Sequence, residues 1–189
     1  MRALPFLLAF GVVPSSPPPP PSTPPQVVIK GVVTTSDGEH PAWFALICTR
    51  GEGAALSLQL RLADTQVSDF DFSAYEGPGA RASRQPSAHL QVDQLKPPAV
   101  AVSGWYGGDA DQDPVPFVFG IATTPGTPGT ATAIAAALGH PGAVLTWAQN
   151  NPGPQGPPLV ARFAPDATES RQITAVAAPC LPRRPGLRM

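Results

Sequence analysis

The chain has 189 residues, a net charge of −1 and only 13% charged residues. These values exclude the concentrated basic surface that binding of nucleic acid requires. With its unusual N-terminal part set aside, a chain of this length predicts one domain, large enough to fold without a metal or a dense disulfide framework. The 27 prolines punctuate the apolar runs and indicate many short strands with long irregular connections.

The two ends of the chain are expected to lie outside the folded domain. Residues 1–15 place Arg2 before an apolar run too short to span a bilayer, which predicts a secretory signal peptide. The alternative is an uncleaved hydrophobic N-terminus. Residues 16–25 are proline-rich and predict an extended linker. Residues 26–181 are expected to form a single β-rich domain, and residues 182–189 a flexible basic tail.

The strongest periodic signal in the chain lies in residues 43–64. Leucine occupies every second position from Leu56 to Leu62 with polar residues between, which predicts a strand with one apolar face. In residues 43–49 the odd-numbered and the even-numbered positions are both mostly apolar, which predicts a strand buried on both faces. Residues 50–53 contain two glycines and suit a short hairpin loop. We expect this hairpin to form the core of the fold.

Shorter patterns predict the remaining elements. Further strands are expected over residues 27–34 (with Gly31 as a candidate bulge), 67–72, 87–95, 99–105, 115–122, 143–149 and 159–163. A helix over residues 131–138 has Thr130 as its cap, and a closing helix over residues 166–178 begins with a capping box of Asp166 and Glu169. The fold class is therefore α+β and mostly β: an antiparallel sheet or sandwich of about eight short strands with two short helices.

The chain holds two cysteines, Cys48 in the apolar strand and Cys180 after the closing helix. In an exported chain this pair predicts a disulfide. The helix would lay a stripe containing Ile173 and Ala177 on the apolar face of the hairpin and carry Cys180 to Cys48. A cross-link closing so long a loop stabilises by about 4–5 kcal/mol in the chain-entropy account. The alternative is a pair of buried free thiols.

One polar turn is a candidate ligand loop. Its side chains are Trp105, Tyr106, Asp109, Asp111 and Asp113. Alternating carboxylates can converge on calcium, but Pro114 and Gly120 stand where an EF-hand loop needs its glycine and its glutamate. Aromatic rings beside carboxylates can also bind a sugar by stacking. The alternatives are a solvated acidic turn and rings that cover the core.

Motifs of catalysis and cofactor binding are not found in the sequence. His40, His89 and His140 have no metal-ligand spacing to another histidine or cysteine. No nucleophile elbow, S-x-x-K motif or G-x-G-x-x-G loop occurs. We therefore expect no cofactor and a non-catalytic protein, with a hydrolase of unrecognised site as one alternative and a calcium- or carbohydrate-binding module as the other.

The order of parts resembles a known group. The parts are a signal peptide, LICTR at residues 46–50, ALGHPGAVLTW at 137–147, L-x-A-R-F at 159–163 and ITAVAAPC at 173–180. This layout resembles the small periplasmic proteins associated with type VI secretion and, more loosely, other exported bacterial β-domains. From this resemblance together with the predicted signal peptide, we expect a periplasmic or secreted domain that binds another envelope protein, with no transmembrane segment after signal cleavage.

Overall fold

The structure is a computed structural model that describes residues 25–36, 38–49, 55–77, 79–107, 115–123, 129–153 and 156–181. The predicted signal peptide, the linker up to residue 24 and the basic tail lie outside the described residues. The predicted hairpin loop at residues 50–53 also lies outside them.

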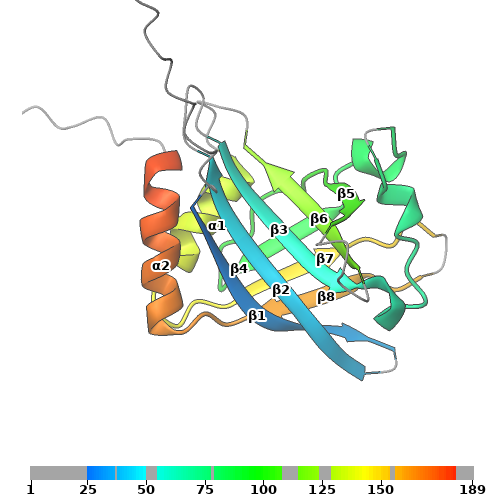
Figure 1. The fold of residues 1–189 in the computed structure, drawn as a ribbon, viewed down its shortest axis with the longest axis horizontal. Coiled ribbons are helices and arrows are strands. Elements are labelled where there is room, and N and C mark those ends of the chain that lie inside the picture. Colours follow the sequence, from blue (N-terminus) through cyan, green and yellow to red (C-terminus); the bar gives the residue numbers. More distant parts are fainter. Residues whose placement is uncertain are drawn as a thin grey trace, which may run out of the picture.

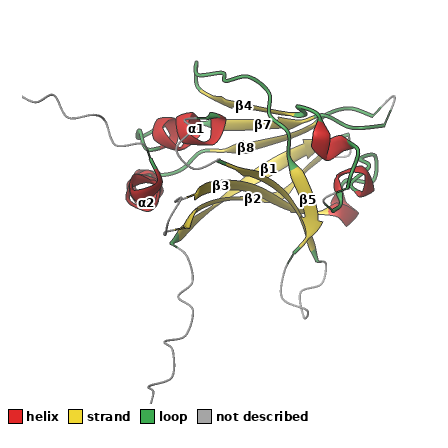
Figure 2. Cartoon of the chain, turned by 90° about the horizontal axis from the view of Figure 1, so that it is seen from above, coloured by secondary structure: helices red, strands yellow, loops and turns green. Residues whose placement is uncertain are grey.

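Eight strands form one antiparallel sheet in the order β4-β7-β8-β1-β2-β3-β6-β5. The strands are β1 (Gln26–Thr35), β2 (Gly38–Thr49), β3 (Ala55–Ala63), β4 (Ala88–Val92), β5 (Ser103–Tyr106), β6 (Pro116–Ala122), β7 (Leu145–Gln149) and β8 (Leu159–Phe163). The sheet curls into a half-barrel, with β1, β2 and β3 on one side and β4, β7 and β8 on the other (Figures 1 and 2). The predicted fold class is confirmed.

Two α-helices cover one end of the curled sheet (Figure 2). Helix α1 (Thr130–Leu138) contacts β3 and β4, whereas α2 (Ala167–Ala177) contacts β1 and β2. The predicted capping box of Asp166 and Glu169 starts α2, but α1 is capped by Gly129 and not by Thr130. The Thr130 hydroxyl donates to the carbonyl of Pro98 at 3.4 Å instead. The closing helix therefore docks on β1 and β2, and α1 packs against the leucine strand.

Short 3-10 turns lie at the other end of the sheet (Figure 2). They are η1 (Asp64–Gln66), η2 (Ser73–Tyr75) and η3 (Ala82–Arg84), while η4 (Ala178–Cys180) continues α2. The prediction of a strand over residues 67–72 is wrong, because this segment turns across the barrel end. Phe70 and Phe72 are both buried, and their rings lie within 6 Å of Phe119. Aromatic packing over β6 thus determines a backbone path that local alternation does not reveal.

The core fills the inside of the curl. Leu56, Leu58, Leu60 and Leu62 are fully buried, as their alternation predicts. The strand predicted over residues 43–49 is buried on its inner face, but on its outer face Trp43 and Ile47 remain partly exposed. That expectation of burial on both faces is therefore wrong for Trp43 and Ile47, although Ala45 between them is fully buried. At Trp43 the reason is that the side chain lines an open groove on the outer face.

Hydrogen bonds also tie down both edges of the sheet. Ala88 of edge strand β4 exchanges both backbone bonds with Val100, each 3.0 Å long. Gly104 of edge strand β5 accepts from the amide of Gly77 at 3.1 Å. The prediction of a strand over residues 99–105 is therefore too long at its start, since residues 99–102 form this single bridge and β5 begins at Ser103. Such tied edges protect a sheet against pairing with other chains.

Gly31 does not form a bulge. β1 pairs with β2 in unbroken register through this position, with Gly31 opposite Ala42. A Cβ built on Gly31 would overlap the carbonyl oxygen of Arg162 and the ring of Phe163. The glycine is needed because Phe163 of β8 lies directly over the β1 backbone on its way to Phe44, with the two ring centroids 5.6 Å apart.

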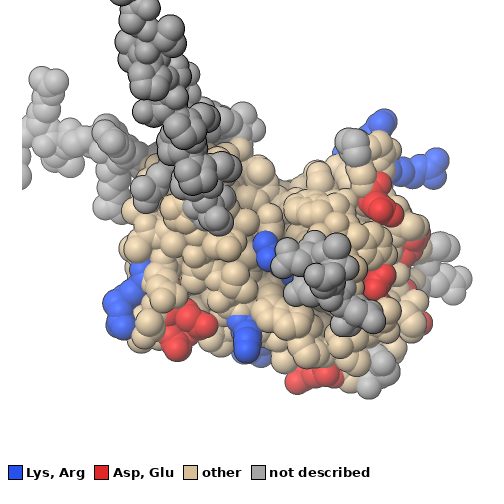
Figure 3. Space-filling model, in the orientation of Figure 1, with Lys and Arg blue, Asp and Glu red and all other residues tan. Residues whose placement is uncertain are grey.

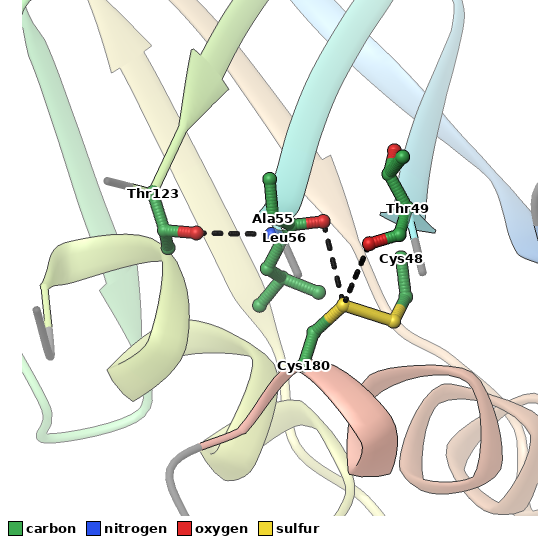
Figure 4. The surroundings of a disulfide bond; sticks show 6 residues. All are labelled: Cys48, Thr49, Ala55, Leu56, Thr123 and Cys180. Atoms are coloured by element: carbon green, nitrogen blue, oxygen red, sulfur yellow. Dashed lines mark hydrogen bonds between the residues drawn. A yellow bond between two sulfur atoms is a disulfide. The ribbon is translucent and has the colours of Figure 1, made fainter. Parts of the chain in front are cut away.

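The predicted disulfide between Cys48 and Cys180 is confirmed. The sulfurs are 2.09 Å apart and the Cα atoms 5.9 Å apart. Figure 4 shows Cys180 reaching the end of β2 from the last turn after α2. Its sulfur lies 3.4 Å from the carbonyl oxygen of Ala55 and 3.8 Å from that of Thr49. A disulfide sulfur carries no hydrogen, so these are close contacts and not hydrogen bonds.

We expect both cysteines to be oxidised in the protein purified from its native compartment. Thiol titration of the denatured, unreduced protein should then find no free cysteine. Cys48→Ser should lower the free energy of unfolding by about 3–5 kcal/mol, because it removes the cross-link and puts a hydroxyl among buried leucines. Cys180→Ser should cost less, since Cys180 is partly exposed. Equal stability of the parent and Cys48→Ser in denaturant titrations would contradict this account.

Gly31→Ala should destabilise the protein strongly. The added methyl group meets backbone and an aromatic ring that cannot both move away, and overpacking of this kind costs about 3 kcal/mol. Gly79→Ala is the matched control, because a Cβ there meets nothing within 4 Å. Chemical denaturation should show a large loss for Gly31→Ala and almost none for Gly79→Ala. Equal midpoints for the two variants would show that Phe163 does not press on β1.

Candidate binding groove

A row of side chains crosses the outer face of five neighbouring strands. The strand registers place the following residues opposite one another in turn: Lys30, Trp43, Arg61, Val118 and Trp105. They come from β1, β2, β3, β6 and β5. Directly opposed residues on one face of an antiparallel sheet have Cβ atoms about 5 Å apart. The outer face therefore holds an arginine between two tryptophans, with a valine beside it.

The Trp105 indole lies flat on the outer face of the sheet. A Cβ on Gly120 would come within 2.5 Å of indole atom Cη2, and one on Gly107 within 2.9 Å of Nε1. The ring thus extends from Gly107 to Gly120 across β6 and uses the space that two missing side chains leave. Its exposed fraction of 38% shows that part of the ring remains open to solvent. Two glycines therefore make a flat aromatic platform.

A groove with a volume of about 540 Å³ runs along this row. The described residues that line it are Val28, Trp43, Gln59, Arg61, Ala63, Gln66, Trp105, Gly107, Pro116 and Val118. Among these lining residues, Arg61 is the one charged side chain. The volume lies within the range of about 300–1,000 Å³ that is usual for ligand pockets. We call this feature the outer groove.

The guanidinium of Arg61 is held in place by a neighbour on its own strand. Nε and Nη2 of Arg61 donate to Oε1 of Gln59, at 3.1 and 2.6 Å. Residues two apart in a strand share a face, so the pair stands side by side on the outer surface. This bidentate contact fixes one edge of the guanidinium and leaves its other donors available to a ligand.

Gln66 brings a second amide to the end of the groove. It belongs to η1, directly after β3. Its Oε1 atom is buried and has no hydrogen-bond partner within the described part of the chain. A buried acceptor without a partner costs free energy, and a bound ligand with a donor could recover it.

The predicted ligand loop is divided by the structure. Trp105 lies on the outer face in the groove, whereas Tyr106 points to the opposite face, where its ring meets Phe117 with centroids 5.0 Å apart. The Tyr106 hydroxyl donates to Oδ2 of Asp64 at 2.7 Å. The other predicted ligands, Asp109, Asp111 and Asp113, lie outside the described residues. Of the five residues predicted there, the groove contains Trp105.

Sequence reasoning missed Trp43, Gln59, Arg61 and Gln66. The alternation in residues 55–63 does place Gln59 and Arg61 on the polar face of their strand. The alternation does not reveal the strand register, which sets Arg61 opposite both Trp43 and Val118. The sequence did contain one indication of this site: a tryptophan in an apolar strand, followed by a strand with an arginine on its polar face.

Among the described residues that line the groove, charge is sparse. On the face shown in Figure 3, which looks onto β1, β2 and β3, uncharged side chains cover most of the surface and the charged ones lie scattered. Within the described ranges, no three histidine, cysteine, aspartate or glutamate side chains gather where they could hold a metal ion. No helix in the same ranges has the length and apolar character needed to cross a membrane.

The fold and the groove define a disulfide-linked protein with a curled antiparallel sheet and an aromatic site on its outer face. Comparison with known proteins adds no family to this description: no family model, curated protein or solved structure matches the chain.

The contact between Tyr106 and Asp64, on the face opposite to the outer groove, can be tested by its pH dependence. The hydrogen bond to Asp64, together with burial, raises the pKa of Tyr106 from 10.0 to about 12, because both favour the neutral phenol. Asp64→Asn should lower the pKa of Tyr106 towards 10.0, since it removes the carboxylate that opposes ionisation. Alkaline titration followed by tyrosinate absorption measures this, with circular dichroism confirming that the protein stays folded.

The Tyr106→Phe variant isolates the signal of Tyr106 by difference, because the chain has a second tyrosine, Tyr75. An unchanged titration in Asp64→Asn would show that the contact between Tyr106 and Asp64 is not made in solution.

Proposed function

We propose that this protein is an exported, non-catalytic domain of the bacterial cell envelope that binds another protein through the outer groove. The observation that carries the proposal is the row of Trp43, Arg61 and Trp105 across an outer sheet face. Tryptophan and arginine are the residues most enriched at the energetic centres of protein interfaces. Here the register of three strand pairs brings them together.

The shape of the face supports binding of a partner. Trp43 and Trp105 remain partly exposed in the groove, and Val28, which also lines it, has an exposed fraction of 42%. Holding such groups in water is unfavourable, and exposed apolar patches framed by polar side chains mark interaction sites. Gln59 holds Arg61 in one orientation before a partner arrives, which lowers the entropy lost on binding.

The polar groups of the groove suit recognition better than reaction. Arg61, Gln59 and Gln66 supply hydrogen bonds that can orient a ligand, and none of the three is of the residue types that usually act as general acid or base. The hydrolase alternative would need titratable groups that converge on the groove. The calcium or carbohydrate alternative keeps one supporting feature, the flat indole of Trp105.

Export is supported by the cross-link between Cys48 and Cys180. Disulfides form and persist in oxidising compartments such as the periplasm or the extracellular medium. The pattern in residues 1–15 and the resemblance of the layout to small periplasmic proteins associated with type VI secretion support the same location. We therefore place the domain in the periplasm or outside the cell.

A comparative pull-down tests this function. The full chain is used as bait on envelope extracts of its own cell, alongside the variant that combines Trp43→Ala with Trp105→Ala. Loss of one hot-spot side chain costs about 2 kcal/mol, so the double variant should recover its partner at least about 30-fold less efficiently. Quantitative mass spectrometry measures the recovery.

Leu95→Ala is the matched control, because Leu95 is a large apolar residue with 40% exposure outside the groove. It should leave recovery unchanged. Equal recovery with the parent and the double tryptophan variant would refute the proposed function, provided that both retain their melting temperature.

A further inference from the structure

We infer that the segment bound in the outer groove is an extended, acidic peptide whose carboxylate pairs with Arg61. This inference rests on the proposed function and specifies the chemistry of the partner. It follows from the donors that line the groove, from the charges along the row and from the distance between the two indoles.

Apart from the buried Oε1 atom of Gln66, which needs a donor, the free side-chain polar groups among the described residues that line the groove are donors. Gln59 has its acceptor engaged by Arg61 and retains the two N–H groups of its amide. Arg61 retains the N–H groups that do not face Gln59, and each indole offers only an N–H. A ligand that satisfies this set must supply acceptors, and a carboxylate supplies several in the planar geometry that a guanidinium matches.

The charges along the row have one sign. Lys30 stands opposite Trp43 at the β1 end and is exposed, while Arg61 stands on the other side of Trp43. Both flank the same indole, so a carboxylate placed on Arg61 also gains from Lys30. Asp64, the acid next along the chain after β3, is held by Tyr106 at 2.7 Å. An acidic ligand is therefore complementary to this part of the face.

The spacing of the two indoles fits a short extended peptide. Trp43 and Trp105 are separated by three strand steps, or about 14 Å. An extended chain advances about 3.3 Å per residue, so about four residues connect groups that rest on the two rings. Arg61 lies one strand step from Trp43. The acidic residue should therefore follow or precede the first apolar anchor by one or two positions, with the second anchor on its far side.

The sheet itself directs the peptide across the face and not along an edge. Addition of a strand needs a free row of backbone groups. In β4 the groups of Ala88 are bonded to Val100, and in β5 the carbonyl of Gly104 accepts from Gly77. The partner is therefore recognised by its side chains, and chiefly by one carboxylate and two apolar or aromatic groups.

Selection from a random peptide library displayed on phage tests this inference, with the full chain as bait. Peptides retained by the parent should be enriched in aspartate or glutamate lying between two apolar or aromatic residues. Synthetic versions of these peptides should bind Arg61→Gln about tenfold more weakly than the parent. Exchange of the acid for its amide in the peptide should cause a similar loss, and added salt should weaken binding of the acidic form only.

Arg162→Gln is the matched control, because it removes the same charge from an exposed position on β8. It should leave the affinity unchanged. Equal binding of the acid and amide peptides, enrichment without acidic residues, or no enrichment at all would overturn the inference. Tighter binding of an oligosaccharide of uronic acids than of the selected peptides would also overturn it.

A further variant tests whether the chain's own acidic residues occupy the outer groove. If a selection on the combined Asp109→Asn, Asp111→Asn and Asp113→Asn variant enriches acidic peptides while the same selection on the parent enriches none, the groove belongs to that segment, and the inference falls. Failure here differs from failure of the proposed function. The pull-down could still show that the double tryptophan variant loses the partner while the peptide selection shows no preference for acidic residues. That result would support the proposed function and contradict only the inference of an acidic peptide.

Discussion

The register between β2 and β3 is the constraint on which the rest of the structure depends. It sets Leu46 opposite Leu58 inside the curl and Trp43 opposite Arg61 outside it. Side chains alternate along a strand, so a slip of one residue would expose the leucines and bury the arginine. The free energy of burying that leucine face therefore also determines where the groove lies. The site is a consequence of the core and needs no separate folding determinant.

Close approaches permitted by glycine complete this arrangement. Gly31 lets Phe163 lie on β1, and Gly120 lets the Trp105 indole lie on β6. The first contact joins β8 to the central strands within the core, and the second builds the platform outside. The same close approach to a glycine thus joins strands in the core on one face and shapes the proposed binding site on the other. The floor of the outer groove is paired sheet, and its arginine is held by Gln59.

The two helices and the disulfide close the end of the curl away from the short 3-10 turns. Helix α2 packs Ile173 and Ala177 into the core and leads directly to Cys180. Because Cys48 belongs to β2, the cross-link joins the last described element to the strand that carries Trp43. Each edge strand is bonded to a neighbouring segment, β4 through Val100 and β5 through Gly77. The outer face that carries Trp43 and Trp105 remains the face of the proposed binding site.

The sequence by itself determined the features that depend on neighbours along the chain. These include the leucine alternation of β3, the capping box at Asp166 and the pairing of the only two cysteines. The tertiary structure alone decided the others. Residues 67–72 turn because distant aromatic rings pack over them, and Trp43, Arg61 and Trp105 meet because three strand pairings align them. Such contacts join residues far apart in the chain, and periodicity within one strand carries no information on the register of the next.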